Sequence, residues 1–267
     1  MTAHSQKQLK PKCVLPFKIT RQNGLHAFQQ WIRKLWFAPN DLKRRARHEE
    51  KLTGIYVPYW TYDSDTTSFY RGQQGIYYWE NETYTTVEDG RRVTRTRRVR
   101  KIRWYPVSGT VWESFNDILV LASHSLPPNY TRQLEPWDLE HLVPYKDEYL
   151  SGFRAESYNI DLERGFEKAK NIMDFRIKDL IEQDIGGDEQ RIDTSRTHYS
   201  NIMFKHILLP VWISAYRYGK KIYRFLINGR TGEVQGERPW SWVKITSAVL
   251  TIVAIVAAIV YLTLQFR

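Results

Sequence analysis

The chain of 267 residues contains a single cysteine, Cys13. One thiol cannot close a disulfide within the chain, and it cannot supply the paired cysteines of a zinc ribbon. The first residues, Met1 to Pro16, also lack the apolar h-region of a secretory signal peptide. These absences exclude a disulfide-stabilised secreted domain and predict a body that faces the reducing cytosol.

Motifs of nucleotide-driven and nucleophilic enzymes are missing as well. The sequence has no Gly-x-Ser-x-Gly elbow, no Gly-x-Gly-x-x-Gly loop and no phosphate-binding loop that ends in Lys-Ser or Lys-Thr. None of the seven histidines has the paired helical spacing of a zinc hydrolase. An ATP-driven motor is therefore rejected, and we assign no catalytic residue, no metal ligand and no cofactor.

One group of acid–base residues leaves an enzymatic activity among the alternative functions of the protein. His124 and His141 occur near Asp117, Asp138 and Glu140, and histidines and carboxylates can exchange protons in catalysis. Surface or packing roles explain such scattered histidines more simply. An unrecognised hydrolase is therefore the third-ranked function, behind two binding functions that need no catalysis.

Aromatic side chains and positive charge are present in excess. Aromatics make up 14% of the chain, with 10 Trp and 17 Tyr, and they favour strands. The 40 Lys and Arg residues against 29 Asp and Glu give a net charge of +11. Such an excess attracts anionic lipid, acidic protein or nucleic acid without selecting among them. The composition predicts a basic, β-rich body.

The longest apolar segment lies near the C-terminus. Residues Ile245 to Leu264 carry no charge, and at about 1.5 Å per residue they match the roughly 30 Å hydrocarbon core of a bilayer. Trp240, Trp242 and Tyr261 occupy the positions of aromatic belts. A buried core helix is the alternative, but it would be unusual at this length, at a terminus and without a polar stripe. We therefore predict a single-pass transmembrane anchor over residues 240–267.

The distribution of charge predicts the orientation of this anchor. The basic body precedes the apolar segment, and only Gln265, Phe266 and Arg267 follow it. Because positively charged segments tend to stay on the cytoplasmic side, and no signal peptide is apparent, we expect a cytoplasmic N-terminal body.

The rest of the chain predicts an α+β body rich in antiparallel sheet, with a helical insert, over residues 14–239. A flexible basic arm is expected at residues 1–13. Apolar residues at three- and four-residue steps predict a helix over 25–35 and the longest soluble helix from about Asp161 to Ile185. The same spacing predicts helix in 115–122.

Strands are predicted where aromatic and β-branched residues gather between turn residues, at 54–78, 84–104, 107–111, 203–218 and 221–227. Gly72 and Gly75 predict a turn within the first of these segments. Pro58-Tyr59-Trp60 resembles Pro210-Val211-Trp212, so residues 54–112 and 200–236 form a candidate pair of related β-units. Convergent strand composition explains the likeness equally well.

The most conspicuous polar segment is the return arm of a predicted two-stranded ribbon. Its cations are Arg91, Arg92, Arg95, Arg97, Arg98, Arg100, Lys101 and Arg103. The interleaved Val93, Val99, Ile102 and Trp104 predict one packed face and one charged face. Three interpretations remain open, in this order: a solvated edge that prevents aggregation, contact with anionic lipid, and contact with nucleic acid.

Several motifs resemble those of a family of bacterial membrane-anchored proteins. The matching segments are Leu15-Pro16-Phe17, Gly54 to Asp63, Pro136 to Leu139, Tyr149 to Phe153, Phe204 to Trp212, Asn228 to Val234 and Gly236 to Pro239. Members often carry an N-terminal zinc ribbon, and many bear the label primosomal protein N′ (replication factor Y), superfamily II helicase. The resemblance implies a bacterial inner (plasma) membrane location. This chain departs from the family because it lacks the zinc ribbon and any helicase motif, and the resemblance implies no catalytic residue.

The leading hypothesis is a membrane-tethered cytosolic binding or scaffold protein whose arginines contact anionic lipid or an acidic protein. The second is a membrane-associated nucleic-acid-binding protein related to replication, without motor activity. Steep salt dependence of DNA or RNA binding would favour the second hypothesis. The specific partner and the oligomeric state do not follow from the sequence.

Overall fold

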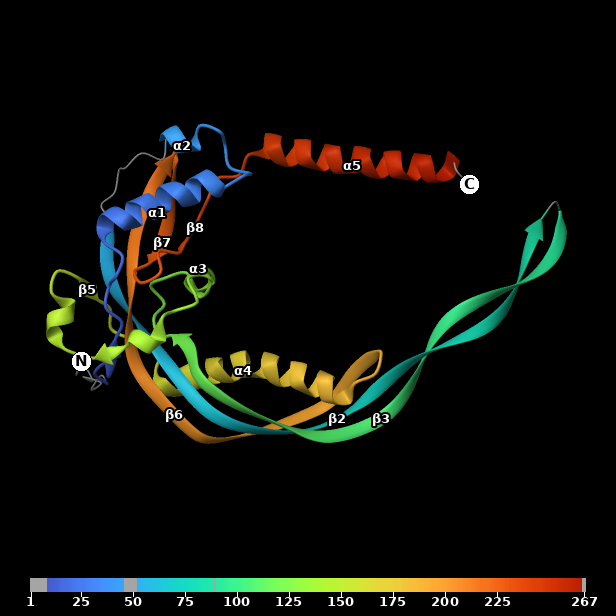
Figure 1. Ribbon diagram of the computed structural model, residues 1–267, viewed down its shortest axis with the longest axis horizontal. Helices are drawn as coiled ribbons and strands as arrows, with labels where there is room; N and C mark the ends of the chain where they lie inside the picture. The colour runs from blue at the N-terminus through green and yellow to red at the C-terminus, as the bar shows by residue number, and fades with distance from the viewer. Residues whose placement is uncertain (1–8, 46–51, 89, 266–267) are drawn as a thin grey trace, which may run out of the picture. The chain divides into compact units, whose positions relative to one another are not determined.

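The computed structural model describes residues 9–45, 52–88 and 90–265 (Figure 1). The chain divides into two compact units. Unit 1 consists of Met1–Tyr59, Leu121–Ile160 and His206–Arg267, and unit 2 of Trp60–Val120 and Asp161–Lys205. The long strands β2 (Thr53–Glu88) and β6 (Glu189–Tyr218) contribute to both units.

The described strands form one eight-stranded sheet with the path β3-β2-β6-β1-β4. The other bounds are β1 Cys13–Val14, β3 Arg91–Leu121, β4 Val143–Pro144, β5 Arg154–Ala155, β7 Lys221–Asn228 and β8 Val234–Gly236. β7 pairs antiparallel with β6 and β8, whereas β1 lies parallel to β6 and β5 parallel to β2. The predicted sheet-rich body with helices is confirmed, and two short parallel pairings make the sheet mixed.

The core of unit 1 forms where α1 (Arg21–Lys34) packs on β6, β7 and β8. The Thr20 side chain accepts a hydrogen bond from the Asn23 backbone N–H and caps the helix start. Phe28 and Ile32 project from one helix face, and Phe28 stacks on Phe225 with 3.9 Å between ring centroids. The helix predicted over 25–35 is thus confirmed by an apolar face that meets the sheet.

Shorter elements complete unit 1. They are α2 (Leu42–Arg45), α3 (Pro128–Gln133) and two 3₁₀ turns at Leu139–His141 and Asp147–Leu150. Of the predicted arm, residues 1–8 lie outside the described part of the chain. Residues 9–13 are ordered, because the Lys12 N–H donates to the His206 carbonyl at 2.7 Å and Cys13 enters β1.

In unit 2, α4 (Leu162–Ile185) is the predicted long helix and is confirmed. Asp161 caps its start by accepting from the Arg164 N–H, and Gly186, at φ +64°, ends it. Its buried positions recur at every fourth residue: Gly165, Ala169, Met173, Ile177, Ile181 and Ile185. Gly165 allows β2 to approach, because an added Cβ would lie 3.0 Å from Trp60. The Tyr62 hydroxyl donates to the Leu162 carbonyl at 2.7 Å and fixes this contact.

Two predictions for unit 2 were wrong. Gly72 and Gly75 do not form a turn, since β2 continues through both to Glu88. Gly75 instead gives space to its neighbours, because an added Cβ would lie 2.9 Å from the Trp104 ring. The helix predicted in 115–122 was also wrong, because β3 continues to Leu121.

The repeat predicted between 54–112 and 200–236 is not decided by the fold. Trp60 and Trp212 are both buried, and β2 and β6 are neighbours in the sheet. Both features are also expected of two unrelated central strands, so the repeat stays a prediction.

Candidate functional site

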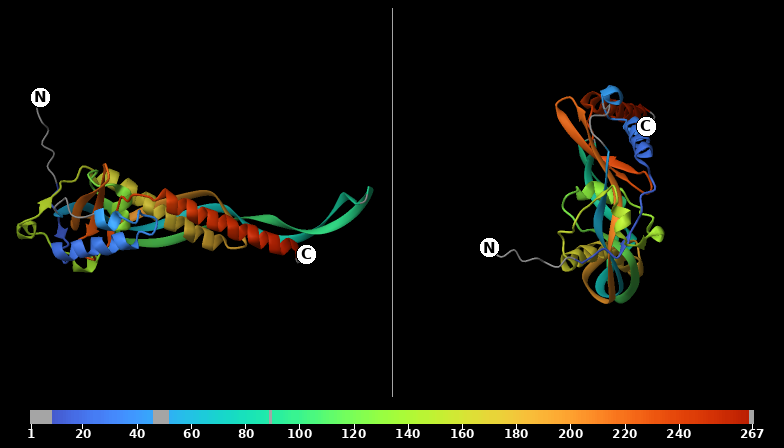
Figure 2. Two further views of the ribbon diagram at one scale, coloured as in Figure 1. Left: turned by 90° about the horizontal axis from the view of Figure 1, so that it is seen from above. Right: turned by 90° about the vertical axis from the view of Figure 1, so that its left-hand side faces the viewer.

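Beyond the end of α4, β2 and β3 of unit 2 continue together as a twisted two-stranded ribbon (Figures 1 and 2). The contacts of β2 with the α4–β6 connection include two hydrogen bonds. The Asp188 N–H donates to the Gly75 carbonyl at 2.8 Å, and the Tyr77 N–H donates to the Asp188 carboxylate at 2.7 Å. We call residues 77–88 and 91–104 the arginine ribbon, and the arginines predicted from the sequence all lie in it.

Four of these arginines lie over aromatic rings of β2. The pairs, with the distance from the guanidinium carbon to the ring centroid, are Arg97 and Tyr84 at 5.4 Å, Arg98 and Trp79 at 5.1 Å, Arg100 and Tyr77 at 4.2 Å, and Arg103 and Tyr78 at 4.9 Å. An aromatic face attracts a cation through its quadrupole, by about 0.5–1 kcal/mol at exposed sites. The aromatic residues therefore hold the guanidinium groups in place without neutralising them.

Among the described residues of the ribbon, Lys101 and Arg97 form ion pairs with acidic side chains. Lys101 Nζ lies 2.8 Å from a Glu80 oxygen and 3.1 Å from a Glu82 oxygen, and Arg97 lies 3.3 Å from Glu82. The hydrogen bond to Glu80 is the main cause that raises the pKa of Lys101, and the bond from Lys101 is the main cause that lowers the pKa of Glu82. Among the described residues, Arg98, Arg100 and Arg103 lie over aromatic rings and form no ion pair, so their positive charge is available to a ligand.

The arginine ribbon is charged on both faces. Side chains alternate along a strand, so Arg97, Lys101 and Arg103 share one face and Arg98 and Arg100 the other. The prediction of one packed and one charged face was wrong, because Val93 and Val99 alternate with Ile102 and Trp104 between the two faces. None of these four apolar side chains is buried.

The second predicted feature, the apolar C-terminal segment, is the helix α5 (Trp242–Gln265) in unit 1. The most apolar 18-residue stretch of this 24-residue helix has a mean hydropathy of 2.6. None of that stretch is buried within the described chain. By length and composition the helix is sufficient to cross a membrane. The predicted span from Ile245 to Leu264 lies wholly inside it.

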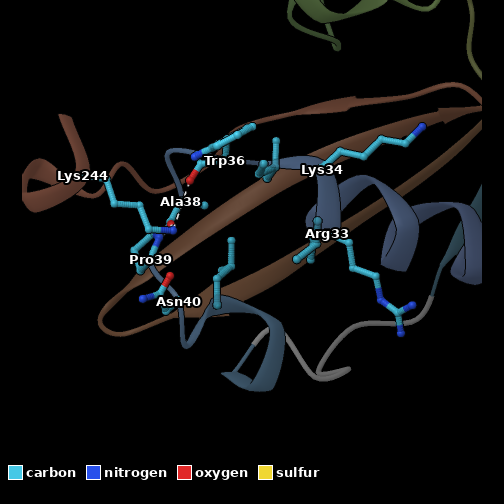
Figure 3. Close-up of a pocket in the computed structure, with 10 residues that line it drawn as sticks. Arg33, Lys34, Trp36, Ala38, Pro39, Asn40 and Lys244 are labelled. Carbon is cyan, nitrogen blue, oxygen red and sulfur yellow. Dashed lines mark hydrogen bonds between the residues drawn. The ribbon is translucent and has the colours of Figure 1, made fainter. Parts of the chain in front are cut away.

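The start of α5 is bound to the connection between α1 and α2, which we call the elbow (residues 35–41). Lys244 Nζ donates to the Trp36 and Ala38 carbonyls at 3.1 and 2.8 Å, and the Ser241 N–H donates to the Phe37 carbonyl at 2.7 Å. A pocket of about 360 Å³ lies beside these bonds. Figure 3 shows Lys244 pointing to Ala38, while Arg33 and Lys34, also of the pocket wall, extend away from it.

The acid–base residues named from the sequence are only partly brought together. His141 Nδ1 lies 2.7 Å from one Asp138 oxygen, and Arg230 Nε donates to the other at 2.8 Å. Arg230, and next His141, hold the pKa of Asp138 below its usual value. The His124 N–H donates to the Asn159 side chain instead, and no bond among the described residues joins it to His141.

Asp117 and Glu140, the other two carboxylates named from the sequence, do not bond to the pair of Asp138 and His141 among the described residues. Asp117 belongs to unit 2, where Lys205 Nζ lies 3.1 Å from its carboxylate, and Glu140 is exposed. Within residues 9–45, 52–88 and 90–265, no group of three or more His, Cys, Asp or Glu could hold a metal ion. The geometry thus supplies one carboxylate–histidine pair.

Among the described histidines, His206 is the most deeply buried. Its Nδ1 lies 2.9 Å from the Leu9 carbonyl, the Tyr158 ring packs against it, and only 7% of the residue is exposed. Burial lowers the pKa of His206, although hydrogen bonds to the Leu9 and Lys10 carbonyls oppose this shift. The folded state therefore favours the neutral imidazole.

This burial predicts acid sensitivity of unit 1. Below a pH of about 6.5 the unfolded chain binds a proton at His206 that the folded chain does not, so stability falls as pH decreases through that range. The urea midpoint of full-length protein in detergent should drop between pH 7.5 and 5.5, and His206→Gln should drop less. The exposed His198→Gln should behave like the parent chain, and equal drops in all three proteins would contradict the assignment to His206.

Sequence reasoning missed the aromatic partners of the arginines. Tyr77 and Tyr78 lie within the predicted strand 54–78, but the register that brings them and Trp79 under the arginines was not predicted. The signal was present, since a Tyr-rich arm and an Arg-rich arm joined by a short turn must face each other in a hairpin.

Comparison with known proteins gives one informative match. No family model matches the chain, and no solved structure matches it. The chain is 27% identical over 247 residues to the uncharacterised protein YdjG of Bacillus subtilis (strain 168). The aligned segment covers 90% of this chain and 67% of YdjG. The alignment includes segments of both units, because it omits only a tenth of the chain. It identifies no activity, ligand or partner.

Proposed function

We propose that the protein is a membrane-tethered binding module, anchored by α5 with its body in the bacterial cytoplasm, whose arginine ribbon binds an acidic protein partner. The observation that carries the proposal is the ribbon itself. It is exposed, and its two faces present Arg98, Arg100 and Arg103 over aromatic rings, with no ion pair to these three arginines among the described residues. Such a surface favours an anionic ligand.

The anchor is supported by the chemistry of α5. The Thr251 hydroxyl donates to the Ser247 carbonyl and the Thr263 hydroxyl to the Val260 carbonyl, so these polar groups are satisfied inside the helix. Trp242 and Tyr261 lie 19 positions apart, which at 1.5 Å per residue is roughly the 30 Å thickness of the hydrocarbon core. The basic body before the helix favours the cytoplasmic orientation.

An acidic protein segment suits the ribbon better than a flat bilayer does. A planar surface can meet only one face of a two-stranded ribbon, and Arg98 and Arg100 lie on the face opposite Arg103. A flexible acidic chain can reach both faces at once. Arginine suits carboxylates because its planar group offers paired donors.

A second candidate function is binding of single-stranded nucleic acid, which the resemblance to proteins labelled primosomal protein N′ would fit. The specific observation in its favour is the pairing of arginines of β3 with exposed aromatics of β2 such as Trp79 and Tyr84. Bases stack on aromatic side chains while cations follow the phosphates. One face of each of these rings already lies under an arginine, so we rank this function second.

A direct test uses the full-length protein in nanodiscs of neutral lipid. Three fluorescent probes are titrated against it: a polyglutamate peptide, a mixed-sequence single-stranded DNA of similar charge, and vesicles that contain phosphatidylglycerol. We expect salt-sensitive binding that is tightest for the peptide. Tighter binding of DNA than of the peptide would overturn the proposal in favour of the second candidate function. Tighter binding of vesicles would identify anionic lipid as the ligand of the ribbon. Absence of binding to all three probes would also overturn the proposal.

A further inference from the structure

The exposed aromatic residues of unit 1 are concentrated around the start of α5. Trp240 precedes the helix and Trp242 begins it. Trp36 and Phe37 belong to the elbow, about 200 residues away in sequence. Trp242 is 76% exposed and Trp36 83% exposed. Large indole rings in water are unfavourable unless another surface covers them, and Trp is enriched where bilayers meet water.

The elbow is fixed to α5 rather than merely close to it. Three hydrogen bonds, two from Lys244 Nζ and one from the Ser241 N–H, end on the consecutive carbonyls of Trp36, Phe37 and Ala38. Because Lys244 precedes the uncharged segment directly, carbonyls bound to it must lie at the depth where that segment begins. A bilayer that receives α5 would therefore meet the elbow at its interface.

The charged side chains that line the pocket beside the elbow are all positive, and the one acidic residue of the elbow, Asp41, accepts a hydrogen bond from the Tyr218 hydroxyl at 2.7 Å. The wall of the adjoining pocket includes Arg33, Lys34 and Lys244 and no acidic side chain. Arg238 lies 4.2 Å above the Trp240 ring and adds a fourth cation near the helix start. Cations beside tryptophans match the anionic headgroups of the cytoplasmic leaflet, which attract each nearby Lys or Arg.

We propose that the elbow is a second membrane contact. Trp36 and Phe37 enter the interfacial layer beside Trp240 and Trp242, and Arg33 and Lys34 lie against anionic phospholipid headgroups. The inference rests on the proposed anchoring by α5 and deepens it, because two contacts restrict rotation of unit 1 about the helix axis where one helix alone would not.

The test places a nitroxide label at single positions of the full chain after Cys13→Ser removes the native thiol. Labels at Trp36→Cys and, separately, Phe37→Cys are compared with Ile252→Cys within α5 and with Glu148→Cys on an exposed turn of unit 1. Collision with oxygen, which concentrates in lipid, is measured by power saturation against collision with a water-soluble nickel chelate, in nanodiscs that contain phosphatidylglycerol.

We expect loss of nickel access at 36, 37 and 252 and full access at 148. Changing both Arg33 and Lys34 to Gln should restore part of the nickel access at 37. Full nickel access at 36 and 37 with protection at 252 would overturn the inference and leave the anchor intact. Full access at 252 would overturn the anchor itself, so the two failures are distinguishable.

Discussion

Replacing Arg98, Arg100 and Arg103 together by glutamine is expected to weaken binding of the polyglutamate probe by roughly three- to a hundredfold. Each exposed ion pair contributes roughly 0.2–1 kcal/mol, and a factor of ten corresponds to about 1.4 kcal/mol. These three arginines are chosen because their neighbours are aromatic, whereas Lys101 is already bonded to Glu80. Fluorescence anisotropy at several salt concentrations measures the effect, and the triple variant should depend less steeply on salt.

The matched control removes the same charge from the same unit. Arg164, Lys168 and Lys178 are exposed on α4, and their change to glutamine lowers the net charge of unit 2 equally. This control should bind within about twofold of the parent chain, since it leaves the arginine ribbon intact. Equal weakening in both triple variants would reduce the ribbon to one part of a diffuse basic surface and contradict a local site.

The helices of this fold could be predicted from sequence because local signals agree there. In α4 a capping aspartate, an apolar residue at every fourth position and a terminal glycine all indicate the same bounds, Asp161 to Gly186. The failure at 115–122 has a specific physical cause. Asp117 has φ +52°, which interrupts the strand alternation between the buried Phe115 and Val120. The apolar residues on its two sides therefore occur at steps that imitate those of a helix, namely Phe115, Ile118, Leu119 and Ala122.

The candidate site was predicted in composition but not in geometry. The arginines were named correctly as a surface group, because eight cations within 13 residues cannot be buried. Their pairing with Trp79 or Tyr84 depends on the register of β2 against β3, which alternation alone does not determine. The elbow was not foreseen, because contacts of Trp36 and Ala38 with Lys244 join segments that no local pattern connects.

Changing Ala254 and Ala258 together to aspartate is expected to release the protein from the membrane. Each aspartate near the middle of a transmembrane helix costs about 2.5–3.5 kcal/mol of insertion free energy, and two such costs exceed what the flanking aliphatic residues readily offset. Carbonate extraction of membranes, followed by immunoblotting, should find the variant outside the pellet. The apolar control, in which both alanines become leucine, should remain in the pellet.

Single aspartates at Val253, Ala254, Ile255 and Val256 then distinguish lipid from protein as the surroundings of α5. These four positions have nearly the same depth and cover about one full turn of the helix. If lipid surrounds the helix, the four substitutions should reduce membrane retention alike. If one face packs against a second copy or another chain, the cost should differ between faces, because an aspartate there can find a polar neighbour or lose a packed contact. A uniform loss would support a monomeric anchor, whereas a loss confined to one face would identify an oligomer interface within the membrane.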